Sequence, residues 1–282
     1  LGVNTTGTLN IGIGSLTGDA ITTGNQNIAI GYRSLSANQT GGENIAIGID
    51  SQKVSTASNN TSVGYDTLKA NTTGTRNVAI GATALDANTT ASDNVAIGYA
   101  AGGAITTGAE NIIVGNFAND ANQTGNYNVA MGHGALGANT ASNNTAIGRK
   151  ALLNNSTGTQ NVALGGEALE ANTTGNYNVA LGKNALLSNT TADNNTAVGT
   201  YSLDANTTGD SNTGLGFGAL GGNTTGTNNT AVGLLALVTN TTGTNNTAVG
   251  KQALNLNTTA SNNTGIGFEA LKANTTGTFN TA

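Results

Sequence analysis

The 282-residue sequence has no cysteine, no proline and no tryptophan, and only 8% of its residues are charged. Without cysteine the chain forms neither disulfides nor thiolate metal sites. No apolar run approaches the roughly 20 residues that span a bilayer, so no membrane insertion is expected in this segment. The formal net charge is −5, and Lys and Arg do not cluster. This charge pattern argues against a nucleic-acid partner.

What the sequence does contain is a repeat rich in Gly, Asn, Thr and Ala. Hydrophobic residues make up 37% of the chain, too many for typical disorder. The motif Asn-x-Ala-aliphatic-Gly recurs every 17 residues, with two steps of 16, and it starts at Asn10, Asn27, Asn44, Asn60, Asn77, Asn94, Asn111, Asn128, Asn144, Asn161, Asn178, Asn195, Asn212, Asn229, Asn246 and Asn263. We number repeat positions 1 to 17 from this Asn.

Three repeat positions are nearly constant. Position 4 is aliphatic and position 5 is Gly in every copy, and position 9 is Leu in twelve of sixteen copies. All charged residues, 9 basic and 14 acidic, fall at positions 6, 7, 10, 16 or 17. Because burying an unpaired charge is costly, the remaining positions are expected to face an interior or an interface.

The pattern within one repeat predicts short β-strands. Positions 2 and 4 share one face at period two and, together with Leu at position 9, are expected to form the core, with Ala at position 3 on the opposite face. A second short strand is expected over positions 7 to 11, with Leu at position 9 and often Ala at position 11 pointing inward, while position 10 is polar. The Ala-Asn-Thr-Thr-Gly segment has the composition of a turn.

A 17-residue unit cannot bury a face alone, so the units must stack with their strands in parallel. The sequence therefore predicts an all-β, parallel β-solenoid of about sixteen 17-residue turns, in which Asn at position 1 forms an amide ladder. We expect residues 1–282 to form a single continuous repeat domain. Since Leu1 and Ala282 both lie inside the pattern, we expect it to be a fragment of a longer chain. The β-branched, Gly and Asn content argues against a helical solenoid.

Several copies resemble a known family. The NVAIG segments at Asn77 and Asn94 and the NTAVG segments at Asn195, Asn229 and Asn246 are similar to the YadA-like head repeats of trimeric autotransporter adhesins, and similar repeats occur in tail fibres of bacterial viruses. The similarity covers essentially the whole chain, although the unit is longer than the usual one. The resemblance implies a left-handed β-roll or β-helix, with three chains side by side.

Position 3 is almost always Ala, Gly or Ser, with Ile113 as the exception. A stripe of small residues on the outer face of the strand would let another chain approach closely. Alternatively, this face packs inside a flattened single coil. The sequence leaves both interpretations open.

Position 6 carries a candidate contact stripe of aromatic residues: Tyr32, Tyr65, Tyr99, His133, Phe217 and Phe268. It is either a recognition surface or a tolerant solvated edge. His133 is the only histidine, and the acidic residues are scattered along the repeats, so we predict no catalytic site and no enzyme activity. We also predict no cofactor and no metal site. The Asn-Thr-Thr turns match the N-glycosylation sequon, which a repeated turn would create in any case.

Two functions fit these features. The first is a structural or adhesive extracellular fibre or filament subunit at a cell or virion surface, self-associating as a homotrimer or filament, with a host-surface or matrix ligand as a further partner. The second is a soluble ligand- or ice-binding β-solenoid, because aligned Thr residues present a regular hydroxyl lattice. The turn Thr residues are consecutive, so they do not share one strand face, and this argues against the second function.

Overall fold

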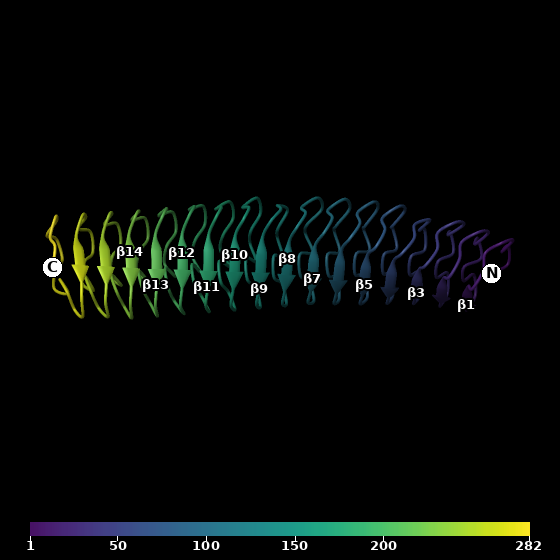
Figure 1. The fold of residues 1–282 in the computed structure, drawn as a ribbon, viewed down its shortest axis with the longest axis horizontal. Helices are drawn as coiled ribbons and strands as arrows, with labels where there is room; N and C mark the ends of the chain where they lie inside the picture. The colour runs from purple at the N-terminus through teal and green to yellow at the C-terminus, as the bar shows by residue number, and fades with distance from the viewer. The chain divides into compact units, whose positions relative to one another are not determined.

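The computed structural model describes residues 1–282, which divide into two compact units, Leu1–Asn143 (unit 1) and Asn144–Ala282 (unit 2). Each unit is a stack of coils that contains only β-strands and turns (Figure 1). Within each unit the strands follow one another in chain order. The predicted all-β parallel solenoid is confirmed, whereas a single continuous domain stays a prediction.

Each coil contributes one three-residue strand at repeat positions 2 to 4. Unit 1 holds β1 (Ile11–Ile13), β2 (Ile28–Ile30), β3 (Ile45–Ile47), β4 (Thr61–Val63), β5 (Val78–Ile80), β6 (Val95–Ile97), β7 (Ile112–Val114) and β8 (Val129–Met131). Unit 2 holds β9 (Thr145–Ile147), β10 (Val162–Leu164), β11 (Val179–Leu181), β12 (Thr196–Val198), β13 (Thr213–Leu215), β14 (Thr230–Val232), β15 (Thr247–Val249) and β16 (Thr264–Ile266). Neighbouring strands pair in parallel, residue for residue, as in Val78 opposite Val95.

The predicted orientation of the strands is wrong. Ala at position 3 is the buried residue, and positions 2 and 4 face outward: Ala96 is 0% exposed, whereas Ile97 is 38% exposed. Where Leu fills position 9, the interior leaves little space at position 3, because even a Cβ on Gly265 would lie 3.3 Å from the Cγ of Leu254 in the preceding coil. The small-residue stripe therefore packs inside a single coil, as the alternative interpretation proposed.

The second predicted strand is absent. Positions 7 to 11 form turns, in which positions 7 and 9 adopt left-handed backbone conformations: φ is +54° at Asp66 and +49° at Leu68. Two left-handed residues so close together prevent an extended strand. Leu at position 9 nevertheless points inward as predicted, and Leu68 and Leu85 are fully buried. The small residue at position 8, such as Ala84, is buried beside it.

The predicted amide ladder at position 1 is confirmed. The side-chain Oδ1 of Asn10 accepts hydrogen bonds from the backbone N and the Nδ2 of Asn27, at 3.0 and 3.1 Å. The same Nδ2 donates to the carbonyl of Gly41 at position 15 of its own coil, at 3.0 Å. Each amide thus links successive coils and closes its own coil, which satisfies polar groups that are completely buried.

A second ladder runs through Asn at position 12. Asn88 Nδ2 donates to Asn71 Oδ1 of the preceding coil at 3.0 Å, and Asn71 Nδ2 donates to the carbonyl of Gly74 at 2.9 Å. The Gly74 N–H in turn donates to Asn71 Oδ1 at 3.0 Å. These Asn side chains are fully buried and bonded except at Asn4 and Asn274, so the sequons of the other coils offer no free amide for glycosylation.

Gly at position 5 is required by the backbone. At Gly182, φ is +139°, and a Cβ would lie 2.7 Å from the carbonyl carbon of Gly199 in the next coil. No residue with a side chain fits such a conformation and such an approach. This explains why the position is invariant.

In one coil of unit 1, position 9 is Gly, and two other residues fill the space that Leu occupies elsewhere. Gly102 stands at position 9, Ile105 at position 12 of the same coil and Ile113 at position 3 of the next. The Cδ1 atoms of Ile113 and Ile105 lie 2.8 and 3.0 Å from where a Cβ on Gly102 would be. The two isoleucines fill the space of the missing Leu, which accounts for Ile113 as the exception at position 3.

Candidate functional site

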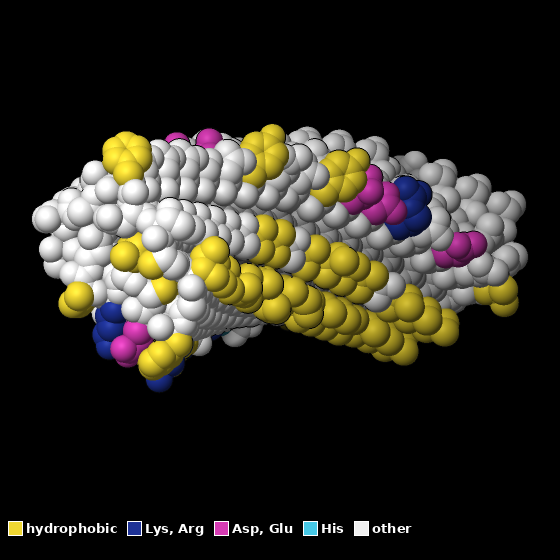
Figure 2. Space-filling model, turned by 60° about the vertical axis from the view of Figure 1, so that its left-hand side comes forward, with side chains coloured by type: hydrophobic (Ala, Val, Ile, Leu, Met, Phe, Trp, Pro, Cys, Tyr) yellow, Lys and Arg dark blue, Asp and Glu magenta, His cyan; other side chains and the backbone are white.

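The outward face of the strands, which we call the strand face, is formed by repeat positions 2 and 4. In unit 1 both rows are aliphatic except at Thr61, and their side chains are half-buried or exposed. Exposure reaches 47% at Ile112 and 39% at Met131. Figure 2 shows hydrophobic side chains gathered in continuous rows on the surface that it displays. This surface was not predicted from the sequence, because positions 2 and 4 were expected to form the core.

The strand face of unit 2 has a different composition. Position 4 is still aliphatic, but position 2 is Thr in β9 and in β12 to β16, and Val only at Val162 and Val179. A hydroxyl-bearing row therefore lies beside an aliphatic row. Behind the two rows, position 3 is mostly Ala in both units, and position 9 is Leu in every coil of unit 2 and in four of the eight coils of unit 1.

The predicted contact stripe at position 6 is exposed along its whole length. Five of its side chains are at least 44% exposed, and His133 is exposed as well: Tyr32, Tyr65, Tyr99, Phe217, Phe268 and His133. The structure does not bring all six together, since they belong to different coils of two units. Its role in recognition stays a prediction.

Within unit 1 the structure joins two stripe residues through a third ring. The Tyr99 and Phe117 rings meet edge to face with centroids 5.2 Å apart, and Phe117 meets His133 at 6.0 Å. In unit 2, Tyr201 meets Phe217 edge to face at 5.9 Å. Phe117 and Tyr201 occupy position 7 and are not part of the predicted stripe. The alternation of positions 6 and 7 between adjacent coils was the signal that could have revealed them.

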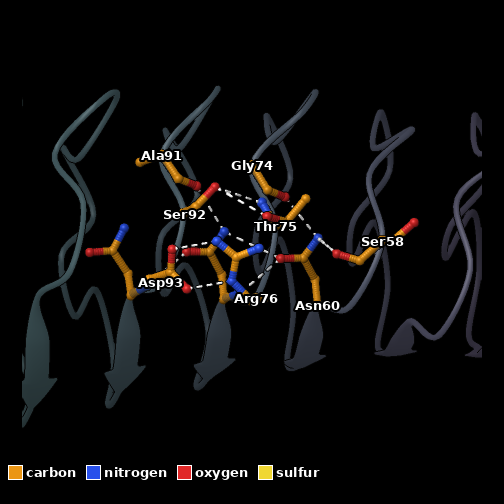
Figure 3. A network of polar contacts seen from close by, with 10 residues as sticks. Ser58, Asn60, Gly74, Thr75, Arg76, Ala91, Ser92 and Asp93 are labelled. Atoms are coloured by element: carbon orange, nitrogen blue, oxygen red, sulfur yellow. Dashed lines mark hydrogen bonds and ion pairs between the residues drawn. The ribbon is translucent and has the colours of Figure 1, made fainter.

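Charged residues pair along the coils beside this stripe. Arg33 lies over the Tyr32 ring, 4.9 Å from its centroid, and donates from Nη2 to Asp50 Oδ2 at 2.7 Å. At position 17 of two successive coils, Arg76 Nε and Nη2 donate to Asp93 at 2.6 and 2.8 Å, beside a Ser and Thr pair (Figure 3). The guanidinium hydrogen bonds lower the pKa of Asp93. Because the Arg76–Asp93 pair is solvent-exposed, it contributes little to stability.

The turn threonines occupy two different environments. At position 13 the hydroxyl is bonded: Thr72 Oγ1 donates to the carbonyl of Thr89 in the next coil at 2.9 Å. Position 14 is exposed and carries Thr in every coil that has the position, at Thr23, Thr40, Thr73, Thr90, Thr107, Thr124, Thr157, Thr174, Thr191, Thr208, Thr225, Thr242, Thr259 and Thr276. Two residues before Thr107 stands Ile105 in place of the usual Asn, so Thr is present at position 14 of this coil without a sequon.

The titratable groups do not assemble into a reactive centre. Burial raises the pKa of the carboxyl groups of Asp86, Asp120 and Asp204, all at position 10, by disfavouring their charged form. No set of three or more His, Cys, Asp or Glu side chains lies close enough together to hold a metal ion. These aspartates are best understood as partly buried groups on the rim of their coils.

The chain matches no protein-family model, no curated protein and no solved structure. The structure also offers no apolar helix of membrane-spanning length.

Proposed function

We propose that the chain is a non-catalytic structural subunit of an extracellular fibre or filament at a cell or virion surface, and that copies associate side by side through the strand face. The observation that carries this proposal is the strand face of unit 1, where two aliphatic rows stay uncovered from β1 to β8.

Burial of this face would be favourable. Positions 2 and 4 carry no charged residue in any coil, so no charge would have to be desolvated. Each Å² of aliphatic surface removed from water contributes about 25 cal/mol. Soluble monomers rarely leave extended apolar patches exposed, and such patches mark association surfaces.

The resemblance to YadA-like head repeats favours a homotrimer, and a longer filament is the other arrangement. In either one, repeat positions 6 and 7 lie outside the proposed interface. The aromatic pairs there, such as Tyr201 and Phe217, would then be available to a host-surface or matrix ligand. Repetition along a fibre would let individually weak contacts act together.

Sedimentation velocity and electron microscopy of the purified chain test this proposal. We expect oligomers of uniform width for the wild type and monomers for the double substitution Val95→Lys and Ile97→Lys, which places charge on the strand face. The control is Thr90→Lys with Thr107→Lys, which adds the same charge at exposed position 14 and should leave association unchanged. A wild type that stays monomeric as its concentration is raised would refute the proposal, and so would face and control variants that behave alike.

A specific observation favours ice binding as a second candidate function. The Thr row of unit 2, from Thr196 to Thr264, does lie on a strand face, unlike the consecutive turn Thr residues. It presents hydroxyl and methyl groups at a spacing of about 4.8 Å per coil. Ice binding requires an uncovered face, so it competes with association. Inhibition of ice recrystallisation that is lost in Thr230→Lys would support it, and no inhibition by the wild type would exclude it.

A further inference from the structure

A polar groove of about 440 Å³ opens on unit 1. It is lined by residues from repeat positions 14, 16 and 17 of successive coils, among them Asn25, Gln26, Thr40, Gly42, Glu43 and Asn59. Its volume lies within the range of about 300 to 1,000 Å³ that is usual for small-ligand sites.

The floor of the groove exists because Gly42 has no side chain. Where position 16 is Asn, Asp or Ser, its side-chain oxygen accepts a hydrogen bond from the backbone N–H of position 16 in the preceding coil, as Ser92 Oγ does from Thr75 at 3.0 Å (Figure 3). Gly42 is the only glycine at position 16 and offers no such oxygen. The backbone N–H of Asn25 therefore has no hydrogen-bond partner within the protein.

The side chains around this N–H are also uncommitted. Gln26, Glu43 and Asn59 stand at position 17 of three successive coils, are exposed, and make no side-chain hydrogen bond. Together they offer amide donors, amide acceptors and a carboxylate acceptor, and the exposed Thr40 adds a hydroxyl. Such a mixed set suits ligands whose hydroxyl groups both donate and accept.

The charge and polarity of the groove limit the class of ligand that it can bind. Glu43 is its only charged residue, and no Lys or Arg lines it, so an anionic ligand is disfavoured. No aromatic or large aliphatic side chain lines it either, so an apolar ligand would gain little there. The lining of the groove therefore favours a neutral, hydroxyl-rich ligand.

We propose that this groove is a binding site for a neutral oligosaccharide. A sugar oxygen accepts the hydrogen bond of the Asn25 N–H, and neighbouring sugar hydroxyls bond to Gln26, Glu43 and Asn59. This function is additional to the fibre role and does not depend on association through the strand face.

The decisive variant is Gly42→Ser. It fills the floor of the groove and supplies the acceptor that the Asn25 N–H lacks, as Ser92 does for Thr75. A Cβ at residue 42 would lie 3.0 Å from the carbonyl oxygen of Asn25, so a small shift is needed. The coil tolerates such a Cβ, because Ala109 occupies the same position four coils later. Loss of binding with an unchanged or raised Tm would separate occlusion of the site from unfolding.

Ala109→Ser is the matched control. It makes the same kind of change at position 16, where it supplies an acceptor to the backbone N–H of Ser92, but it lies outside the groove. We would measure binding of glucan, mannan, galactan and chitin hexasaccharides by saturation-transfer NMR and titration calorimetry at millimolar concentrations. We expect at least one sugar to bind the wild type and Ala109→Ser equally, and to bind Gly42→Ser about tenfold more weakly or not at all.

Two results would overturn the proposal. One is the absence of binding of any of these sugars to the wild type, and the other is equal binding to the wild type and to Gly42→Ser. Neither bears on the fibre proposal, whose sedimentation test uses strand-face variants.

Discussion

The two units differ first in their interiors. In unit 2 every coil has Leu at position 9 and Asn at position 12, and every step is 17 residues. Unit 1 contains both 16-residue coils, which begin at Asn44 and Asn128, and all four exceptions at position 9: Gly18, Gln52, Gly102 and Asn119. Both units nevertheless form the same coil with the same three-residue strands.

The units differ again on the strand face, which is almost wholly aliphatic in unit 1, whereas six of its sixteen residues are Thr in unit 2. Their backbone pairing is the same, with Thr213 opposite Thr230 as Val78 is opposite Val95. Gly at position 5, the buried Ala and the Asn ladders, which both units share, therefore specify the coil. The outward rows can therefore change composition without changing the fold, and they are the positions available for function.

The largest expected effect is common to both units. Gly98→Ala in unit 1 and Gly199→Ala in unit 2 each force a Cβ onto the next coil, at 2.7 Å from the carbonyl carbon of Gly115 or Gly216, in a backbone conformation with φ above +130°. We expect each to lower the free energy of unfolding by about 3–5 kcal/mol. Hydrogen exchange should show opening of the coils around each site.

Gly166→Ala provides the control for both, because nothing lies within 4 Å of its added Cβ. It should change stability by less than about 0.5 kcal/mol. If alanine were tolerated at residue 98 but not at residue 199, the two units would not share one coil backbone.

The next effect tests whether Ile105 and Ile113 in unit 1 compensate for the missing Leu at position 9, which every coil of unit 2 has. Gly102→Leu alone should lower stability by about 1–3 kcal/mol, because Ile105 and Ile113 occupy the space. Adding Ile105→Asn and Ile113→Ala should restore at least wild-type stability. Residue 102 already has φ +60°, close to the +50° of Leu85, so the backbone accepts Leu. Chemical denaturation of the single and triple variants measures the coupling between these residues. Additive effects of the substitutions on the free energy of unfolding would disprove compensation.

Exchange of the outward rows should leave stability almost unchanged and alter association. Val78→Thr with Val95→Thr gives unit 1 the face of unit 2, and Thr230→Val with Thr247→Val does the reverse. We expect less than about 0.5 kcal/mol change in unfolding per residue. The dissociation constant of the assembly should rise about tenfold in the first variant and fall in the second. A large drop in stability would mean that the rows help to specify the coil.

The smallest effect concerns pH and should be alike in the two units. Burial raises the pKa of Asp86 in unit 1 and of Asp204 in unit 2. The folded state therefore holds these protons more tightly, and the two groups oppose folding once pH rises through their folded pKa. Asp86→Asn and Asp204→Asn should each raise Tm slightly at neutral pH and have no such effect below pH of about 3.8. A lower Tm for both at neutral pH would contradict the assigned cause.

Much of the coil could be predicted from the sequence. The strand at positions 2 to 4, the inward Leu at position 9, the amide ladder at position 1 and the invariant Gly all follow from the repeat. The direction of the strand did not, because alternation defines two faces without saying which one is inside. Hydrophobicity misleads when the interior accommodates only a methyl group, as at Ala96. The left-handed conformation of Leu at position 9 could not be predicted either, since Leu rarely adopts positive φ.

The sites were harder to predict than the coil. The exposure of the position 6 rings followed from the restriction of charges to the same positions. The pairing of Phe117 with Tyr99 and His133 did not, because it joins different repeat positions in adjacent coils. The groove depends on one glycine, Gly42, at a position that varies freely, and only the hydrogen bonds of the neighbouring coils reveal what it lacks.

The strand orientation and the proposed interface are tested most directly by the labelling rate of single cysteines introduced at residues 95, 96 and 97 into this cysteine-free chain, measured over a range of protein concentrations. We predict that Ala96→Cys is protected at every concentration. Val95→Cys and Ile97→Cys should react readily in dilute solution and become protected as copies associate through the strand face. Rapid labelling at residue 96 with protection at residues 95 and 97 in dilute solution would contradict the strand orientation. Labelling rates at residues 95 and 97 that do not change with protein concentration would contradict the proposed interface.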